Sequence, residues 1–453
     1  MKQPTIGKGE RNKMALKETL KQKIEAFRPR IQKLVKETGK VKIDEVTIEQ
    51  CIGGARDIRS LVTDISYLDP QEGIRFRGKT IPETFACLPK AAGSDYPTVE
   101  AFWYFLLTGE VPTPEQVDDV VAEWKGRQQV PQYVFDAIRA LPLESHPMVM
   151  LSVAISAMQK DSKFARFYES GQFNKMVAWE YVYEDACDIV ARIPVIAAFI
   201  YNLKYKGDQQ IAIDPSLDMG ANFAHMIGQG EAYQDVARMY FILHSDHESG
   251  NVSAHTTHLV HSALSDPYLS YAAGLNGLAG PLHGRANQEV LDWTLKFQEK
   301  YCKDQEPTKE LITKALWDTL NSGQVIPGYG HAVLRKTDPR YTSQREFCQK
   351  NLPGDPLFKL VSMIFEVAPG VLTEHGKTKN PWPNVDAQSG VIQWHYGVKE
   401  WDFYTVLFGV GRALGCMANI TWDRGLGYAI ERPKSVTTAM LEEWAAVGGR
   451  KVA

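Results

Sequence analysis

The sequence predicts an all-α protein with two helical domains and one small β-hairpin near the N-terminus. From residue 98 onward, apolar residues recur at helical spacing behind helix-start signals such as Thr-Pro-Glu-Gln at 113–116. Residues 61–80 carry the one convincing strand signal. The stretch 285–390 is broken by Gly- and Pro-rich loops, which indicates a separate lobe.

The composition is that of a soluble globular protein. The 453 residues allow two or three domains, and 44% are hydrophobic and 23% charged. A net charge of −3 gives no basic signature for nucleic-acid binding. The six Cys are scattered with no Cys-x-x-Cys pair, which favours reduced thiols over disulfides or a Cys-type zinc site.

We predict no membrane segment, because the best apolar run, 189–203, is interrupted by Arg192 and Pro194 and is too short. The basic N-terminus lacks an apolar secretory core and makes a poor mitochondrial transit peptide. These features favour a bacterial cytoplasmic location. The mitochondrial matrix is the alternative for a processed eukaryotic chain.

The first elements follow from their patterns. Residues 15–38 predict an amphipathic helix, kinked at Pro29 and ended by Gly39. Two short strands flank the turn at 69–73 within 61–80. Further helices are predicted at 99–107, from 114, and at 148–158, 174–206, 215–228, 286–299, 308–321, 341–350 and 404–416, before a polar tail.

His283 lies between Pro281, which fixes its own φ, and Gly284, which tolerates unusual backbone angles. The following 285–291 is strong helix-forming sequence, so we place His283 at the start of a helix. The positive end of the helix dipole disfavours the imidazolium, and a neutral His can donate to a developing oxyanion. A capping or core His in a Gly-rich turn is the alternative.

Five of the eleven His lie between residues 244 and 261. They are His244, His247, His255, His258 and His261. Pairs spaced by three share a helix face, which suggests a metal site. However, there is no His-Glu-x-x-His motif and no Cys partner, and 249–251 interrupts the helix. Hydrogen bonding between helices is the favoured interpretation.

The segment 328–340 combines Gly, His and Arg. Its glycines let the backbone approach a ligand closely. His331 and Arg340 can face one anionic substrate, while Arg335 and Lys336 suit phosphate or pyrophosphate. A basic surface loop is the alternative, and the density of these residues favours function.

The segment 377–386 is stiffened by two Pro and can be shielded from water by Trp382. A carboxylate held there, Asp386, gains basicity by desolvation. Its alternative role is the N-cap of a helix starting near Ala387. The Gly run at 409–415 approximates a dinucleotide-binding fingerprint, but it has no βαβ context, and close helix packing explains it better.

Three motifs together resemble those of the citrate synthase family, in its eukaryotic-type branch. They are Gly280-Pro281-Leu282-His283-Gly284, Pro327-Gly328-Tyr329-Gly330-His331 and Asn384-Val385-Asp386. The resemblance runs from about residue 15 to about residue 440. It implies a large domain of residues 1–284 and 391–453 that forms the dimer, a small domain of 285–390, and an active site between them.

The resemblance also implies roles for single residues. The catalytic residues would be His283, His331 and Asp386. Oxaloacetate would be bound by His247, Arg340, Arg412 and Arg432. Coenzyme A would be bound by Arg56, Arg166, Gly328, Tyr329, Arg335 and Lys377. Arg432 would reach into the partner subunit's site, which implies a homodimer. His244 would be a buried neighbour of the site, and His255 and His258 structural. His261 stands where the family leads us to expect a small residue.

The implied reaction is the condensation of acetyl-CoA with oxaloacetate and water to give citrate and coenzyme A. The thioester is a co-substrate, and no tightly bound cofactor or metal is expected. Apart from the resemblance, three Arg and two His suit a small dicarboxylate, and a separate Lys/Arg set suits a phosphorylated cofactor. The alternatives are a 2-methylcitrate synthase that uses propionyl-CoA and, more distantly, a non-catalytic metal-binding helical protein.

Overall fold

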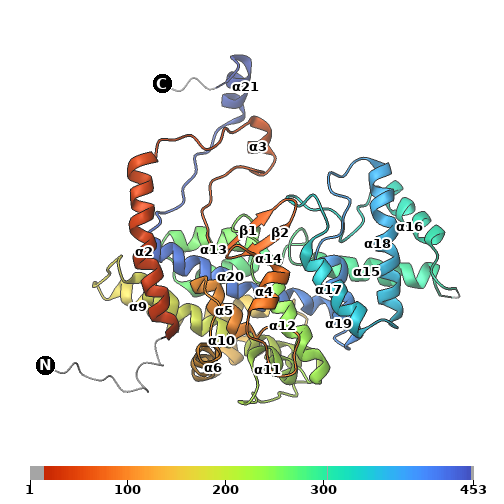
Figure 1. Cartoon of the computed structure of the whole chain (residues 1–453), viewed down its shortest axis with the longest axis horizontal. Helices are drawn as coiled ribbons and strands as arrows, with labels where there is room; N and C mark the ends of the chain where they lie inside the picture. Colours follow the sequence, from red (N-terminus) through yellow and green to blue (C-terminus); the bar gives the residue numbers. More distant parts are fainter. Residues whose placement is uncertain (1–14, 304, 450–453) are drawn as a thin grey trace.

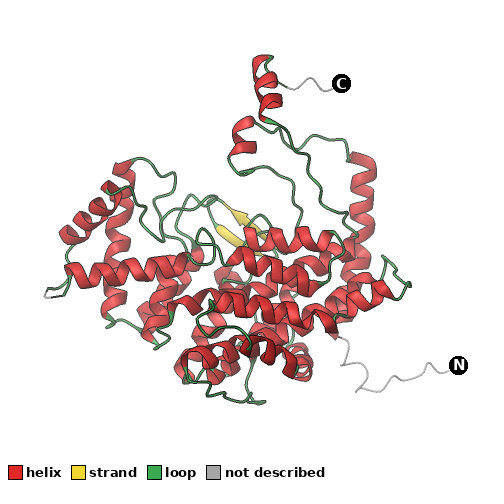
Figure 2. Ribbon diagram, turned by 180° about the vertical axis from the view of Figure 1, so that it is seen from behind, coloured by secondary structure: helices red, strands yellow, loops and turns green. Residues whose placement is uncertain are grey.

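The computed structural model describes residues 15–303 and 305–449, and it is built almost entirely of helices (Figure 1, Figure 2). The basic N-terminal residues Lys2, Lys8, Arg11 and Lys13 lie outside the described range. All six Cys are unpaired, as predicted. The predicted all-α class with a small antiparallel sheet is confirmed.

The centre of the molecule is formed by α20 (Tyr404–Leu426), in which every residue is buried. It packs on α10 (Ala178–Tyr205), α12 (Gln234–Leu243), α13 (Val252–Ser262) and α14 (Pro267–Leu278). The sequence predicted only the first half of α20. The last turns to Leu426 are rich in polar residues, and they are helical because the surrounding helices bury them.

The glycines of α20 allow this close packing. A Cβ on Gly411 would lie 2.8 Å from the carbonyl oxygen of Phe241, and one on Gly415 would lie 2.3 Å from that of Ser245. A Cβ on Gly409 would lie 3.0 Å from a methyl group of Leu275. The preference for helix packing over dinucleotide binding is therefore confirmed.

Further helices surround this centre. They are α2 (Ala15–Thr38), α3 (Ile48–Ile52), α4 (Ile81–Cys87), α5 (Val99–Thr108), α6 (Pro114–Arg127), α7 (Gln132–Arg139), α8 (Pro147–Ala157), α9 (Lys163–Glu169) and α11 (Met219–Met226). In the described residues, three 3-10 turns lie between helices, namely η1 (Met158–Asp161) after α8, η2 (Glu231–Tyr233) before α12 and η3 (Trp401–Phe403) before α20. Thr113 and Gln116 form the predicted capping box of α6, and His146 caps α8 through its ring nitrogen.

The sheet is antiparallel with strand order β1-β2-β3. The predicted hairpin is β1 (Ser66–Asp69) and β2 (Gly73–Phe76), with Ser66 opposite Phe76. A third strand, β3 (Lys79–Thr80), was not predicted. Gly73 has a φ of +89° and touches the ring of Pro339, where a Cβ would lie 2.3 Å away. The hairpin turn therefore supports the start of α17 (Pro339–Asn351).

Five helices gather at one end of the longest axis of the molecule (Figure 1, right). They are α15 (Ala286–Tyr301), α16 (Lys309–Asn321), α17 (Pro339–Asn351), α18 (Pro356–His375) and α19 (Asp386–His395). Within this group α15 and α17 pack on α19, and α16 packs on α18. The sequence analysis omitted α18, although Asp355 caps it and Pro356 opens it.

Two further findings depart from the predictions. The tail contains a helix, α21 (Thr438–Ala446), which extends away from the body as α3 does (Figure 1, Figure 2). Among the described residues, three helical stretches, Ala178–Tyr205, Pro356–His375 and Trp401–Leu426, are long and apolar enough to cross a membrane. The prediction that no segment approaches a membrane span is therefore wrong on length and composition. The most apolar windows of the first and third are 83% and 100% buried inside the protein, which accounts for their composition.

Candidate active site

One cleft collects residues from six separated segments of the chain. Its volume is about 400 Å³. Six of the predicted site residues line it, namely His247, His283, His331, Arg340, Asp386 and Arg412. They come from the loop before α13, the α14–α15 turn, the loop after Ile326, and α17, α19 and α20.

His283 lies in the turn before α15, which starts three residues later at Ala286. The backbone N–H of Ser253 points at His283 Nε2 from 3.3 Å, and the Ser253 hydroxyl lies 2.9 Å from the same nitrogen. Because Nε2 accepts from an N–H, the proton of the neutral ring is on Nδ1. Nδ1–H is therefore the group that His283 can offer to a ligand.

The His283 ring is neutral, as predicted, but for a different reason. Burial, followed by the charges of Arg412 and Arg340, lowers its pKa to about 3. The helix dipole on which the prediction relied is not among these causes. Two Arg and desolvation thus prevent a second proton from binding.

His331 offers the opposite ring nitrogen. Its Nδ1 accepts hydrogen bonds from the N–H groups of Val333 at 3.0 Å and Leu334 at 3.1 Å. The neutral ring must then carry its proton on Nε2. Burial and Arg340 lower the pKa of His331 to about 4. Its ring centroid is 5.2 Å from that of His247.

His247 and His244 are both neutral but differ in their partners. Burial and Arg340 hold the pKa of His247 well below its ordinary value, and its buried Nε2 has no partner. His244 stacks on Tyr240, and its Nδ1 lies 2.8 Å from the Tyr240 carbonyl oxygen. His247 is thus free to contact a ligand, whereas His244 supports the wall behind it.

Two buried Arg give the cleft its positive charge. Arg412, 1% exposed, donates from Nη1 to Asn251 Oδ1 at 2.7 Å and from Nε to the His244 carbonyl at 3.1 Å. Arg340, 4% exposed, pairs with Asp338 at 2.6 Å. Arg412 has no carboxylate among its hydrogen-bond partners, so a bound anion would offset the cost of burying its charge.

Asp386 is the first residue of α19, and its buried Oδ1 has no hydrogen-bond partner. Burial raises its pKa to about 7, although Arg340 opposes the shift. The N-cap of α19 is Val385 and has no side-chain cap. The alternative interpretation of Asp386 as the capping residue is therefore wrong. Its side chain is an available base.

Asn384 holds the two loops of the cleft together. Its Nδ2 donates to the Gly330 carbonyl at 3.0 Å, and its Oδ1 accepts from the Asp386 N–H at 3.0 Å. Asp386 and the loop that carries His331 are thus fixed relative to each other.

A second pocket of about 590 Å³ adjoins the cleft, because His331 and Ala332 line both. Four of the residues predicted to bind coenzyme A lie there, namely Arg56, Tyr329, Arg335 and Lys377. His375 and Lys379 also line it and were not predicted. The pocket is large and basic, which suits a phosphorylated ligand.

Three predicted residues are not brought to either pocket. Arg166 is on α9, at the opposite end of the longest axis from α18 (Figure 1). Gly328, with φ +78°, packs under α19, where a Cβ would lie 2.9 Å from Ala387 Cα. Arg432 is exposed on the segment that leaves α20. Their binding roles stay predictions.

The remaining His lie away from the cleft. His255 and His258 face Glu431 and Asp423. His261 is buried against Phe164, with its Nδ1 2.9 Å from the Ser265 carbonyl. Within residues 15–303 and 305–449, no group of three or more His, Cys, Asp or Glu side chains is arranged to hold a metal ion.

The sequence analysis missed three residues around the cleft. Asn251 and Ser253 contact Arg412, and Ser253 also contacts His283. Glu248 lines the cleft with a φ of +54°, which a non-Gly residue rarely adopts. Burial, followed by Asp246, raises its pKa to about 7. Their position within six residues after His247, a predicted substrate-binding residue, was the available signal.

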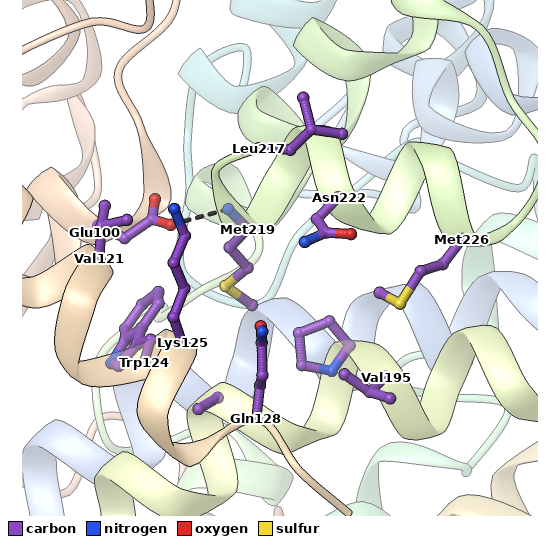
Figure 3. A pocket seen from close by; sticks show the side chains of 12 residues that line it. Glu100, Val121, Trp124, Lys125, Gln128, Val195, Leu217, Met219, Asn222 and Met226 are labelled. Carbon is purple, nitrogen blue, oxygen red and sulfur yellow. Dashed lines mark hydrogen bonds between the residues drawn. The ribbon is translucent and has the colours of Figure 1, made fainter. Parts of the chain in front are cut away.

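A separate hollow lies between α5, α6, α10 and α11, with Glu100 at one end (Figure 3). The Met219 N–H donates to Glu100 Oε1 at 2.8 Å, and Glu100 Oε2 has no protein partner. The hollow measures about 30 Å³, the share of one liquid water. It is too small for an organic substrate, so the chemistry belongs to the cleft.

The cleft can remove a proton from a weak carbon acid. Asp386 supplies a carboxylate whose basicity is raised by burial. His283 and His331 are neutral donors through opposite ring nitrogens, suited to a developing oxyanion. Arg340 and Arg412 suit a substrate that carries carboxylates.

Comparisons with known proteins agree with this chemistry. The sequence profile described as citrate synthase, C-terminal domain, matches residues 54–434. The mitochondrial citrate synthase of Saccharomyces cerevisiae is 54% identical over 95% of this chain and 90% of its own length. The mitochondrial 2-methylcitrate synthase of Yarrowia lipolytica is 52% identical over 96% and 93%. The crystal structure of citrate synthase from Pyrobaculum aerophilum matches with a TM-score of 0.73 and 26% identity, covering 88% of this chain and 95% of that one.

Proposed function

This chain belongs to the citrate synthase family, and we propose that the cleft is its active site, with His283, His331 and Asp386 as the catalytic residues. The enzyme is an acyltransferase that condenses acetyl-CoA with oxaloacetate and water to give citrate and coenzyme A. The assignment rests on the buried Asp386 carboxylate, whose Oδ1 has no hydrogen-bond partner. The same cleft holds two neutral imidazoles, His283 with its proton on Nδ1 and His331 with its proton on Nε2.

The first step is enolisation of acetyl-CoA. The Asp386 carboxylate takes a proton from the methyl carbon, and the electron pair of that C–H bond moves toward the thioester carbonyl. His283 donates its Nδ1–H to the thioester oxygen as negative charge develops there. Because the ring is neutral, it stabilises the oxygen without the cost of burying a second charge beside Arg412.

The second step forms the carbon–carbon bond. The enol carbon attacks the ketone carbon of oxaloacetate, and His331 gives its Nε2 proton to the new alkoxide. Arg340 and Arg412 hold the carboxylates, and His247 contacts the same substrate through its free Nε2. Water then adds its oxygen to the thioester carbon of citryl-CoA, and one water proton returns to His331. The proton on Asp386 passes to the leaving thiolate, which releases citrate and coenzyme A.

We assign the adjoining pocket to coenzyme A. Arg56, Arg335 and Lys377 surround it with positive charge, and Lys379 adds to the same wall. The pocket meets the cleft at His331, where the thioester end must lie for the acetyl group to reach Asp386. Coenzyme A is thus bound as a substrate.

We further propose two domains, 1–284 with 391–453 and 285–390. The cleft draws Asp386 and Arg340 from the second group and Arg412 and His247 from the first. An oxaloacetate that contacts both groups gains more contacts when they approach, so substrate binding would favour closure.

A homodimer is supported by the two arms that leave the body of the molecule. Large hydrophobic side chains are exposed along them, namely Leu34, Val35, Val41, Ile43, Val46, Ile48, Ile52, Ile430, Val436, Met440 and Val447. Such apolar surface marks an interaction site. Arg432 lies among these residues and is free to enter a cleft of a second copy. We propose that it binds oxaloacetate there.

We propose the mitochondrial matrix as the location, because the relatives from Saccharomyces cerevisiae and Yarrowia lipolytica are mitochondrial enzymes. The prediction of a bacterial cytoplasmic location finds no support among these relatives. A tagged full-length chain imaged beside a matrix marker would test the location.

The 52% identity to a 2-methylcitrate synthase keeps propionyl-CoA as a second candidate substrate. The two acyl groups differ by one methylene, which is worth about 1–3 kcal/mol of discrimination. A thiol-release assay with oxaloacetate should give kcat/KM for acetyl-CoA about 10- to 200-fold above that for propionyl-CoA. Equal kcat/KM values, or a higher value for propionyl-CoA, would identify the enzyme as a 2-methylcitrate synthase.

A further inference from the structure

One face of α13 holds the chain segment that follows α20. His255, His258 and Ser262 are spaced by three and four residues, so they share that face. All three contact a single residue of the segment, Glu431. Figure 1 shows this segment leaving α20 and running toward α21.

The contacts with Glu431 involve both its backbone and its carboxylate. Its N–H donates to Ser262 Oγ at 3.0 Å. Its Oε1 lies 2.8 Å from His255 Nε2, and its Oε2 lies 3.6 Å from His258 Nε2. The hydrogen bonds of the Glu431 N–H and of its Oε1 thus hold both the backbone and the side chain of this residue against α13.

His258 also fixes the end of α20. His258 Nδ1 lies 2.6 Å from Asp423 Oδ2, and this hydrogen bond raises the pKa of His258 above its ordinary value. The Asp423 carbonyl accepts from the N–H groups of Gly427 at 3.0 Å and Tyr428 at 3.1 Å, where the chain leaves the helix. The segment is thus anchored from its start to Glu431.

We propose that Glu431, held by His255 and His258, is a positioning residue that aims Arg432 at the oxaloacetate site of the partner subunit. This inference rests on the role proposed above for Arg432. Glu431 lies directly before Arg432, and Pro433 follows it. A residue before Pro is restricted to extended backbone, so an anchored Glu431 leaves Arg432 few directions.

The position of α13 gives this anchor its importance. The first turn of the helix contacts the cleft of its own subunit, where Ser253 touches His283 and Arg412. The face of α13 that carries His255 and Ser262 holds the segment with Glu431 and Arg432, and we place Arg432 in the cleft of the partner subunit. His255 and His258, which the cleft does not use, thereby serve the reaction through Arg432.

The test is steady-state kinetics on full-length dimers. Glu431→Ala should raise KM for oxaloacetate roughly tenfold, because an ångström-scale misplacement of a binding group has effects of this size or larger. Glu431→Gln keeps an acceptor for His255 and should raise it less than about threefold. KM for acetyl-CoA at saturating oxaloacetate should not change. The control Glu144→Ala removes the same charge at an exposed site outside both arms and should have no effect.

A double mutant separates positioning from a general structural role. In the Arg432→Ala background, Glu431→Ala should add no further rise in KM for oxaloacetate. An equal rise in both backgrounds, or no rise in the single variant while Arg432→Ala raises KM, would overturn the inference. If Arg432→Ala itself has no effect, the proposed role of Arg432 fails instead. His255→Ala, at a side chain 39% exposed, tests the anchor if Glu431→Ala does not fold, and it should shift KM in the same direction.

Discussion

At the scale of single residues, burial decides the chemistry of the cleft. The same desolvation raises the pKa of Asp386 and lowers the pKa of His283 and His331. A carboxylate in water would be too weak a base for a thioester methyl group, and an imidazolium would add charge beside two Arg. Removal from water therefore gives Asp386 the basicity, and the two His the neutral rings, that the proposed mechanism needs.

Replacement of the base is the direct test of its role. Asp386→Asn should lower kcat by about 10²–10⁴-fold, the usual contribution of a general base. The fold and oxaloacetate binding should persist, because Asp386 Oδ1 makes no hydrogen bond in the protein. Thiol-release kinetics and calorimetric titration with oxaloacetate would measure the two effects. Retention of more than about a tenth of the activity would exclude Asp386 as the base.

The pH dependence should show the titration of the same group. Activity needs the ionised carboxylate, whose fraction grows with pH, so kcat/KM for acetyl-CoA should rise between pH 6 and pH 8 around the pKa of about 7. His283 and His331, with pKa values of about 3 and about 4, stay neutral across this range. A flat profile from pH 6 to pH 8 would contradict the assigned pKa of Asp386.

At the scale of elements, α20 sets the positions of the cleft residues through its glycines. Gly415 touches the carbonyl of Ser245 and the side chain of Asp246, which directly precede His247. Gly411 lies beside Arg412 and touches the end of α12. The glycine spacing thus brings the His loop against α20 and fixes His247 relative to Arg412.

Gly415→Ala should therefore damage both stability and activity. The new methyl group would lie 2.3 Å from a backbone oxygen that cannot turn away, at a cost of about 1–3 kcal/mol. Chemical denaturation would measure this loss, and KM for oxaloacetate should rise as His247 shifts. Gly126→Ala in α6 is the matched control, since a Cβ at that position would have no heavy atom within 4 Å. The control should be neutral or more stable by about 0.5–1 kcal/mol. Equal stability of the Gly415 variant and wild type would contradict the packing argument.

At the scale of the whole molecule, the role proposed for Arg432 predicts that each active site is built from residues of both subunits. At an oxaloacetate concentration far below the raised KM of the Arg432→Ala variant, Arg432→Ala and His283→Ala homodimers should each be nearly inactive. After subunit exchange, a mixed dimer contains one site with both defects and one with neither, because only Arg432 crosses over. Its activity should reach about half that of wild type if the sites are independent. Native mass spectrometry would verify that mixed dimers form. Mixed dimers without activity would place Arg432 in its own subunit's site.

Closure over oxaloacetate is the second prediction at this scale. Asp386 and Arg340 come from the 285–390 group and His247 and Arg412 from the rest, so one dicarboxylate bridges both. Small-angle scattering should show a smaller radius of gyration with oxaloacetate alone, and acetyl-CoA should then bind more tightly. Unchanged scattering together with unchanged acetyl-CoA affinity would speak against closure.

Local sequence was enough to predict the helical class, the hairpin and the starts of about half of the described helices. The resemblance to the citrate synthase family then pointed to six residues that line the cleft. Caps such as Thr113 act within one turn, so neighbouring residues suffice to find them. The motifs around His283, His331 and Asp386 are equally local. Helices α7, α9 and α18 and the end of α20 were not predicted, although α18 carries a readable start signal at Asp355.

Properties that depend on distant neighbours were fixed only by folding. The tautomer of His283 is set by Ser253, thirty residues earlier in the chain, and its pKa by burial and two Arg from other helices. The separation of Arg166 from the second pocket depends on where α9 packs. Desolvation and Coulomb interactions act through space, so no spacing of residues along the chain encodes them directly. The sequence therefore pointed to six residues that line the cleft, and the fold fixed their protonation states and partners.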